Sequence, residues 1–367
     1  MMQKRIFLLA PILTNLISFR EELILRLCAE GFSVTLVCSY EEEYAPFTES
    51  GVNYINVNID RRGANPSKEL ALLKSYYKLL KKTKPDCVLT YTTKCSIYGG
   101  LACRRLRIPC IINNSGLIDP KRISPLFGKV VTVLYKIGFA KASHIMYQNS
   151  DEKEVLNRIL SNKVPNTLLP GSGVNLAKYA FCKIPKDGPL VFLMICRIQK
   201  EKGIEEYLNA VRYLKPKYGN VRFCVLGGFD EDYHKEIDEL VNAGLLDYHT
   251  PVKDVRPFVQ ECSCVVNPSY HEGMSNVLLE AAAMGRPLIA SDCPGCNDIV
   301  KDGINGSLVK VADTQSLIEK MEQFISLPFD EKVTLGINAR RIVEKSFDRN
   351  IVINQYLKTI YQILPNS

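Results

Sequence analysis

Short apolar runs alternate along the chain with longer segments in which apolar residues recur every three or four positions. The runs 4–11 and 33–39 have the length and composition of buried parallel strands. Between them, the segment 19–29 places Leu23 and Leu27 on one face, which is the spacing of an amphipathic helix. Further strands are expected at 54–59, 87–91, 108–113, 145–148, 190–196, 223–226 and 288–290. This alternation predicts an α/β protein built on parallel sheets.

The most informative alternation lies between residues 265 and 300. An apolar run is followed there by turn-forming residues, and Ser275 or Asn276 then caps a helix that Gly285 ends. Because this helix begins just beyond a strand end, its free N–H groups and the positive end of its dipole favour an anion, above all a phosphate. We therefore predict a phosphate site at the start of this helix.

Two carboxylates flank the predicted phosphate site. Glu272 lies just before the helix, and Glu280 follows after seven intervening residues, about two helical turns along. Carboxylates repel phosphate, but they accept hydrogen bonds from sugar hydroxyls. An anion site with a carboxylate on either side suits a nucleotide-sugar.

The stretch SYHEGMSNVLLEAAAMGRPLIASD, residues 269–292, sets these two carboxylates among glycines and a proline at fixed spacing. In this combination it resembles the retaining glycosyltransferases of family 4. The alternative is an ordinary strand–helix–strand turn with two solvated carboxylates, since the bare spacing occurs often by chance. The resemblance covers nearly the whole chain and is strongest from 190 to 310.

The resemblance implies the GT-B fold, in which two Rossmann-like domains face each other across a cleft and a C-terminal helix crosses back to the first domain. Residues 1–180 would form an acceptor-binding domain, 181–346 a nucleotide-sugar-binding domain and 347–367 the returning helix. A chain of 367 residues is long enough for two domains of ~100–200 residues each. The segment 181–189, with two prolines and a glycine, fits the linker.

By the same resemblance, Arg197 and Lys202 match the pair that binds the donor's diphosphate. A leaving nucleoside diphosphate gains charge as the glycosidic bond breaks, and two fixed cations stabilise it. The resemblance assigns Glu272 to the donor sugar hydroxyls and Glu280 to the ribose hydroxyls. The further donor contacts that it implies are the backbone of Gly273, Met274, Ser275 and Asn276 at the diphosphate, and the chain near Val252 at the base.

No cofactor and no metal are expected, since the two cations supply the charge that a metal ion would. The pattern Asp230-Glu231-Asp232 has the Asp-x-Asp spacing of metal-dependent glycosyltransferases, but it lacks the nucleotide-binding context and is interpreted as a solvated loop. The 13 cysteines are scattered and are interpreted as reduced thiols. Cys293-Pro-Gly-Cys296 is interpreted as a turn with two small buried side chains.

The acceptor-binding half carries a weaker signal. The segment 10–18 follows the first strand at a place where the family often has a glycine-rich loop, and this chain has no glycine there. We assign Asn15 in this segment, and Ser115 and Gly116 after the strand 108–113, to substrate binding. None of the four histidines lies at a strand end next to the expected sugar site. No catalytic histidine is therefore assigned.

The charge of the chain is unevenly placed. Residues 1–180 hold 25 Lys/Arg and 14 Asp/Glu, a net +11, whereas residues 181–367 hold 22 and 25, a net −3. A basic first half indicates either an anionic partner, nucleic acid or anionic lipid, or simply a solvated basic surface. The segment 124–142 interleaves lysines with an apolar stripe comprising Leu126, Val130, Val133, Leu134 and Ile137. This segment is either a basic amphipathic helix on anionic lipid or a core-packed helix with exposed lysines.

The resemblance implies a retaining hexosyl- or N-acetylhexosaminyltransferase without a protein nucleophile. The expected donor is a nucleotide-sugar, in particular a UDP-sugar. The expected acceptor is a glycan or a polyprenyl-diphosphate-linked glycan of surface polysaccharide, as in capsule or lipopolysaccharide biosynthesis. No apolar run reaches the ~18 residues of a spanning helix and no signal peptide is visible, so we expect a cytoplasmic protein peripheral at the inner face of the cell membrane.

Two alternatives belong to other functional classes. The first is a nucleotide-sugar epimerase or hydrolase on the same fold, which would turn over without an acceptor. The second is a noncatalytic protein that binds nucleic acid or membrane through a basic Rossmann unit. The set of Arg197, Lys202, Glu272 and Glu280 argues against the second alternative, and nucleic acid is not expected as a partner.

Overall fold

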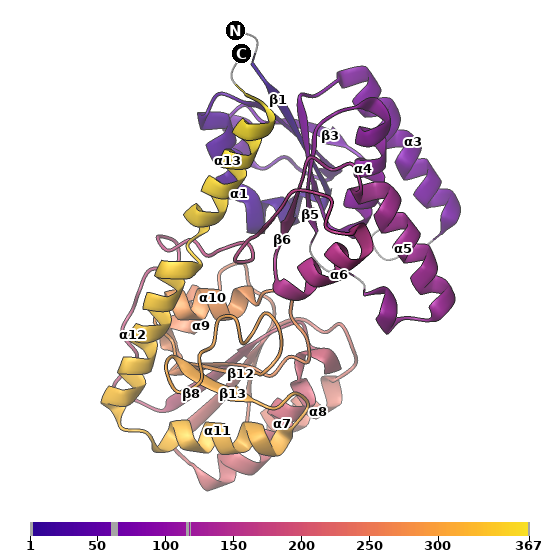
Figure 1. Cartoon of the computed structure of the whole chain (residues 1–367). Coiled ribbons are helices and arrows are strands. Elements are labelled where there is room, and N and C mark those ends of the chain that lie inside the picture. Colours follow the sequence, from indigo (N-terminus) through magenta and orange to yellow (C-terminus); the bar gives the residue numbers. More distant parts are fainter. Residues whose placement is uncertain (1–2, 60–64, 115–116, 118, 366–367) are drawn as a thin grey trace. The chain divides into compact units, whose positions relative to one another are not determined.

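The computed structural model describes residues 3–59, 65–114, 117 and 119–365 (Figure 1). The chain folds into two compact units. Unit 1 comprises Met1–Ser172 together with Val352–Ser367, and unit 2 comprises Gly173–Ile351. No helix among the described residues is both long enough and apolar enough to cross a membrane.

Within the described residues, unit 1 is built on a seven-stranded parallel sheet with the order β3-β2-β1-β4-β5-β6-β7. Its strands are β1 (Arg5–Ile12), β2 (Ser33–Ser39), β3 (Asn53–Asn56), β4 (Cys87–Tyr91), β5 (Cys110–Asn114), β6 (His144–Tyr147) and β7 (Asn166–Leu168). Alternate residues of β1 belong to two different hydrophobic cores. Ile6 and Leu8 pack on one face of the sheet, and Phe7 and Leu9 pack on the other. Both faces are therefore covered by helices, as the continuous apolar runs predicted.

The helices of unit 1 are α1 (Leu13–Ala29), α2 (Ala45–Glu49), α3 (Pro66–Thr83), α4 (Thr93–Leu106), α5 (Pro125–Phe139) and α6 (Ser150–Leu160), with a short 3-10 turn η1 (Pro120–Arg122). The core on one face of the sheet contains residues of α1, α2 and the last helix. The core on the opposite face contains residues of α3, α4, α5 and α6. Helix α4 packs against both α3 and α5, so these three helices form one layer.

Unit 2 has, in the part of the chain that is described, a six-stranded parallel sheet with the order β10-β9-β8-β11-β12-β13. Its strands are β8 (Leu190–Ile195), β9 (Val221–Leu226), β10 (Asp247–His249), β11 (Cys264–Asn267), β12 (Leu288–Ser291) and β13 (Gly306–Val309). Its helices are η2 (Lys200–Lys202), α7 (Ile204–Lys217), α8 (His234–Asn242), α9 (Arg256–Glu261), α10 (Asn276–Ala283), α11 (Thr314–Ser326) and α12 (Phe329–Ser346). One core joins the sheet to α7, α8 and α11, and the other joins it to α9, α10 and α12.

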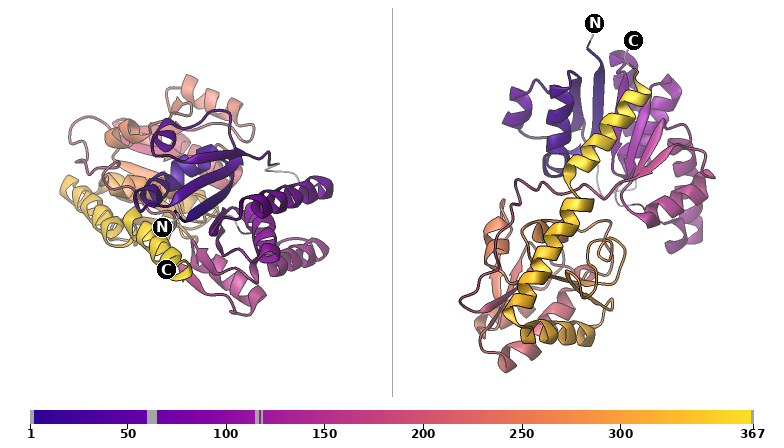
Figure 2. Two further views of the ribbon diagram at one scale, coloured as in Figure 1. Left: turned by 90° about the horizontal axis from the view of Figure 1, so that it is seen from above. Right: turned by 60° about the vertical axis from the view of Figure 1, so that its left-hand side comes forward.

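The last helix, α13 (Arg349–Ile363), returns to unit 1 (Figure 1 and Figure 2). Its buried residues Val352, Tyr356 and Ile360 belong to the same core as the first strand. The buried guanidinium of Arg20 lies 5.1 Å from the ring centre of Tyr91 and 6.0 Å from that of Tyr356. This cation–π arrangement joins α1, β4 and α13. The predicted return of a C-terminal helix to the first sheet is confirmed.

Some boundaries differ from the sequence prediction. The third strand ends at Asn56 instead of continuing to residue 59. The segment after β1 is no loop, because α1 begins at Leu13, directly after the strand. The last helix begins at Arg349 and not at residue 347, because Phe347 ends α12 and Asp348 forms a β-bridge with Val174.

Helix α5 packs on the core of unit 1 and exposes its lysines, but most of the apolar stripe predicted for the segment 124–142 does not lie in that core. Core packing is wrong for Leu126, Val130 and Val133, which are exposed. The buried positions are instead Gly128, Val131, Tyr135, Gly138 and Phe139. A Cβ on Gly100 of α4 would lie only 2.3 Å from the backbone oxygen of Gly138, so the two glycines let the helix backbones approach closely. That approach selects the glycine face of α5 for packing and leaves Leu126, Val130 and Val133 outside, while Leu134 lies at the edge of the core.

Candidate active site

Three loops of unit 2 meet at the carboxyl ends of neighbouring strands. The strands β8, β11 and β12 are adjacent in the sheet, and each is followed by a loop that carries predicted site residues or their supports. In open parallel sheets, ligands bind beyond the carboxyl ends of the strands. The loop after β8 carries Arg197 and Lys202, and the loop after β11 carries Glu272 and the residues up to the start of α10.

Lys202 and Glu272 form an ion pair between two of these loops. The Nζ of Lys202 lies 2.7 Å from Oε1 of Glu272, and the two side chains are only 18% and 16% exposed. Gly203 makes this pairing possible. It adopts a positive φ of +74°, and a Cβ there would lie 2.2 Å from the backbone oxygen of Pro268. Only glycine lets the two loops approach this closely.

A chain of side-chain hydrogen bonds holds Glu272 in place. The hydroxyl of Ser269 lies 2.8 Å from Oε1 of Glu272 and 2.6 Å from Oδ1 of Asn267, and it can donate to either. The amide of Asn267 donates to the hydroxyl of Ser275 at 2.7 Å. Asn267, Ser269 and Ser275 are all buried. The network therefore connects the end of β11, the Glu272 carboxylate and the cap of α10.

The start of α10 has the structure that the sequence predicted. Ser275 is the N-cap, and its hydroxyl accepts a hydrogen bond from the amide of Leu278. The loop before the helix packs against Gly295, which has a φ of +78° and whose Cβ would lie 2.7 Å from the backbone oxygen of Glu272. Since the first N–H groups of a helix have no intrahelical partner, the end of α10 beside Lys202 provides donors for an anion.

Glu280 lies on α10 in different surroundings. Burial raises the pKa of this half-buried carboxyl, whereas a hydrogen bond from Tyr179 and the nearby charges of Arg349 and Lys178 act in the opposite direction. Burial, together with the carboxylate of Glu280, raises the pKa of the Tyr179 phenol. The two glutamates thus have different partners. Glu272 is paired with a cation, and Glu280 is hydrogen-bonded to a phenol.

Arg197 is ion-paired with Asp230, and the arginine side chain is 62% exposed. The first aspartate of the Asp-x-Asp pattern therefore has a cationic partner. Among the described residues, no group of three or more His, Cys, Asp and Glu side chains has an arrangement that could hold a metal ion.

The remaining predicted residues lie at several places. Met274 and Asn276 are half-buried in the loop and first turn at α10, next to Gly273. Val252 is exposed in the loop after β10. Asn15 is half-buried in the first turn of α1, in unit 1. Ser115 and Gly116 lie outside the described residues.

Cys293 and Cys296 lie in the turn after β12, and both are buried free thiols. The Cys293 thiol donates to the backbone oxygen of Ser269 at 3.5 Å. A hydrogen bond with Cys296 lowers the pKa of Cys293 and raises that of Cys296. The interpretation as a turn with two buried side chains is confirmed, and the turn also supports the loop that carries Glu272.

The structure thus pairs Lys202 with Glu272 and connects Glu272 through Ser269 and Asn267 to the cap of α10. Asn267, Ser269 and Tyr179 were missed as supporting residues. A signal existed for Asn267, because a polar residue directly after the apolar run 264–266 is unusual at the end of a buried strand. For Ser269 and Tyr179 no pattern in the sequence indicated a partner.

Two family models match the chain. Residues 13–149 match the model described as "Glycosyl transferase 4-like", and residues 189–326 match "Glycosyl transferases group 1". Together the two matches span most of both units.

Curated relatives are similar along nearly the full length. The chain is 26% identical to N,N'-diacetylbacillosaminyl-diphospho-undecaprenol alpha-1,3-N-acetylgalactosaminyltransferase of Campylobacter jejuni, with 95% of this chain and 96% of the relative covered. It is also 26% identical to UDP-Gal:alpha-D-GlcNAc-diphosphoundecaprenol alpha-1,3-galactosyltransferase of Escherichia coli, over 89% of this chain and 91% of the relative.

Solved structures share the fold at low sequence identity. A glycosyltransferase from Rickettsia africae superposes with a TM-score of 0.80 at 17% identity, and all of both chains is covered. Anabaena Alr3699/HepE in complex with UDP superposes with a TM-score of 0.78 at 18% identity, over 98% of this chain and 100% of the other.

Proposed function

The chain belongs to the group 1, family 4-like glycosyltransferases with the GT-B fold, and from this membership we propose that it transfers a sugar from a UDP-sugar, with retention of configuration, to a polyprenyl-diphosphate-linked glycan. The observation that carries the proposal is the Lys202–Glu272 ion pair, whose carboxylate lies in the loop that leads into α10. The Escherichia coli relative is named for a UDP-Gal donor, and both curated relatives are named for undecaprenyl-diphosphate-linked substrates.

The donor diphosphate occupies the start of α10 in this proposal. Backbone N–H groups of the segment 273–276 donate to its oxygens, and Lys202 supplies a cation beside them. As a phosphate takes over Lys202, the carboxylate of Glu272 is released to accept hydrogen bonds from the donor sugar hydroxyls. The ion pair thus holds both groups ready in the absence of donor, at little cost in reorganisation.

Arg197 reaches the same diphosphate by exchanging Asp230 for a phosphate. Its side chain is exposed, so the exchange needs no opening of the core. A diphosphate can replace the carboxylate because it carries more negative charge and also accepts two parallel hydrogen bonds from the guanidinium. Two cations then stabilise the negative charge that develops on the leaving UDP, and the proposed reaction needs no metal ion.

We propose retention from the family membership, and the placement of the carboxylates fits a mechanism without a covalent intermediate on the protein. Glycosidases that form a covalent intermediate place one carboxylate on either side of the bond that breaks. Here Glu272 and Glu280 both come from one loop–helix segment, and we assign both to holding the donor. The proton of the acceptor hydroxyl then passes to the leaving phosphate oxygen, on the face from which UDP departs.

The proposed acceptor determines where in the cell the enzyme acts. A polyprenyl chain is confined to a bilayer, while a nucleotide-sugar is dissolved in the cytoplasm. The reaction therefore takes place at the inner face of the cell membrane, in the assembly of a surface polysaccharide. The protein would act there as a peripheral enzyme.

A transfer assay with a UDP-sugar panel and a polyprenyl-diphosphate-linked acceptor tests this function. Lys202→Ala and Arg197→Ala should each lower the rate by ~10²–10³, the usual effect of losing one donor that stabilises developing negative charge. Lys200→Ala is the matched control, because Lys200 lies in the same turn and pairs with Glu205. Nuclear magnetic resonance of the product gives the anomeric configuration.

An inverted product would refute retention. Near-normal rates in both variants would remove the diphosphate assignment. Consumption of the UDP-sugar at full rate without acceptor would identify an epimerase or hydrolase instead.

A further inference from the structure

The layer formed by α3, α4 and α5 in unit 1 is strongly basic. The three helices contain ten lysines and arginines and one acidic residue, Glu69. Glu69 is itself ion-paired with Lys94, at 2.6 Å. The other nine cations are exposed: Lys68, Lys74, Lys78, Lys81, Lys82, Arg104, Arg105, Lys129 and Lys136. The excess positive charge of the first half of the chain is thus concentrated on one helical layer.

The same layer exposes apolar side chains on α5. Leu126 is 78% exposed, Val133 55%, Val130 48% and Phe127 47%. They lie on the side of α5 opposite its buried residues, and Lys129 and Lys136 flank them. A helix that is apolar on its outer face as well as its inner face is expected where both faces meet apolar surroundings.

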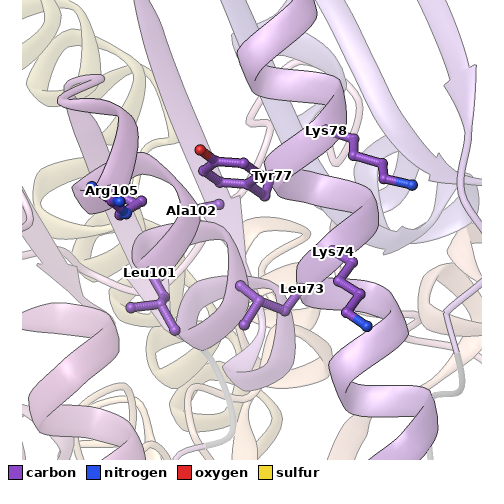
Figure 3. A pocket seen from close by; sticks show the side chains of 7 residues that line it. All are labelled: Leu73, Lys74, Tyr77, Lys78, Leu101, Ala102 and Arg105. Atoms are coloured by element: carbon purple, nitrogen blue, oxygen red, sulfur yellow. The ribbon is translucent and has the colours of Figure 1, made fainter.

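A groove between α3 and α4 adds an apolar recess to this layer (Figure 3). Its volume is about 320 Å³, and almost all of its lining is apolar. Leu73 and Tyr77 of α3 point toward Leu101 and Ala102 of α4, while Lys74 and Lys78 extend from the other side of α3. Arg105 of α4 also lines the recess. An apolar groove bordered by cations suits an amphiphile with an anionic head and a hydrocarbon chain.

We propose that the α3–α4–α5 face docks on an anionic lipid bilayer, with the apolar stripe of α5 in the headgroup region and one lipid chain in the α3–α4 groove. Basic helices with an apolar outer face bind membranes through buried apolar area together with attraction to anionic lipids. A second copy of this face fits less well, because a symmetric dimer would oppose the same cations. The inference rests on the proposed function in one respect: docking would bring the enzyme to its lipid-linked acceptor.

Co-sedimentation with vesicles tests the charged part of the surface. The wild type should bind vesicles that contain phosphatidylglycerol and not those of phosphatidylcholine alone. Changing Lys74, Lys78 and Arg105 to Gln should weaken binding by on the order of 10²-fold, about fivefold for each cation lost near an anionic surface. The matched control replaces three exposed lysines of unit 2, Lys235, Lys310 and Lys345, and should bind as the wild type does.

Fluorescence tests the insertion of α5. The chain contains no tryptophan, so a single introduced tryptophan reports on one site. Leu126→Trp should show a blue-shifted emission on anionic vesicles and quenching by lipids brominated on their chains. Ile304→Trp is the control, because Ile304 is also an exposed apolar residue but lies in unit 2, and its emission should not change.

Each outcome bears on the docking surface alone. Vesicle binding that is equal in the wild type and the Lys74/Lys78/Arg105 variant, or an unshifted Leu126→Trp on bound protein, would overturn the inference. A monomer–dimer equilibrium that Leu126→Asp abolishes, without vesicle binding by the wild type, would instead show a self-association surface. Transfer to a short-chain, water-soluble acceptor should be unchanged in the charge variant, so that failure of docking and failure of the proposed function are distinguishable.

Discussion

Replacing Gly203 by alanine should uncouple the two halves of the donor site. The new Cβ would lie 2.2 Å from the backbone oxygen of Pro268, and this contact must open to at least 3.0 Å. The obstacle is backbone, which cannot rotate away as a side chain can. Because Pro268 begins the loop that carries Glu272, the opening moves Glu272 away from Lys202. A misplacement of about 1 Å at a reacting centre costs on the order of 10²-fold in rate.

Gly244→Ala is the matched control. Gly244 also has a positive φ, +67°, but no atom lies within 4 Å of its missing Cβ. Both alanine variants carry the left-handed backbone penalty of about 1–2 kcal/mol, and only Gly203→Ala carries the contact with Pro268. Gly203→Asn separates the two effects further, since asparagine tolerates the left-handed region but keeps the Cβ.

The assay is the turnover rate at saturating UDP-sugar, with the melting temperature measured in parallel. We expect Gly203→Ala and Gly203→Asn to lose activity about equally, while Gly244→Ala loses only stability. A Gly203→Ala enzyme with the rate of Gly244→Ala would refute the reasoning, because the close approach of the two loops would then be unimportant for catalysis.

Three further outcomes are expected. Turnover should survive EDTA, since Arg197 and Lys202 supply the charge, and activity that is abolished by EDTA and restored by Mn²⁺ would contradict this. Glu280→Ala should weaken UDP binding by about 1.5–3 kcal/mol, the range for a hydrogen bond to a charged group, and unchanged affinity in calorimetry would remove Glu280 from the ribose. Burial raises the pKa of Glu280 above its ordinary 4.5, so the folded chain binds this proton more tightly than the unfolded chain. The free energy of unfolding therefore falls as pH rises between the two pKa values, and Glu280→Gln should gain melting temperature over the wild type above that window but not below it.

The sequence predicted those parts of the fold that depend only on residues close together in the chain. The strand runs are continuous apolar stretches, and the cap at Ser275 is a property of one residue and its neighbours. The face on which α5 packs was not predictable, because it depends on Gly100 of another helix approaching Gly138. Apolar periodicity shows that a helix has an apolar stripe, but not which of two such stripes is covered.

The residues of the candidate site also differ in how far the sequence could predict them. Arg197, Lys202, Glu272 and Glu280 could be named from spacing and resemblance, since each stands in a recognisable motif. Their partners could not, because an ion pair between Arg197 and Asp230 joins residues 33 positions apart on separate loops. Which carboxylate a cation contacts is decided by the course of both loops, and no local pattern contains that information.

The return of α13 has a consequence for how the protein is made. Unit 2 is complete within residues 173–351, so it can fold as soon as that stretch has left the ribosome. Unit 1 begins earlier but finishes later, because its core needs Val352, Tyr356 and Ile360, which are synthesised after unit 2. Domains generally fold as units during synthesis, from the N-terminus onward, and here the order is reversed. The nascent first sheet therefore keeps part of one apolar face uncovered until α13 has been synthesised, which makes it a natural client for chaperones.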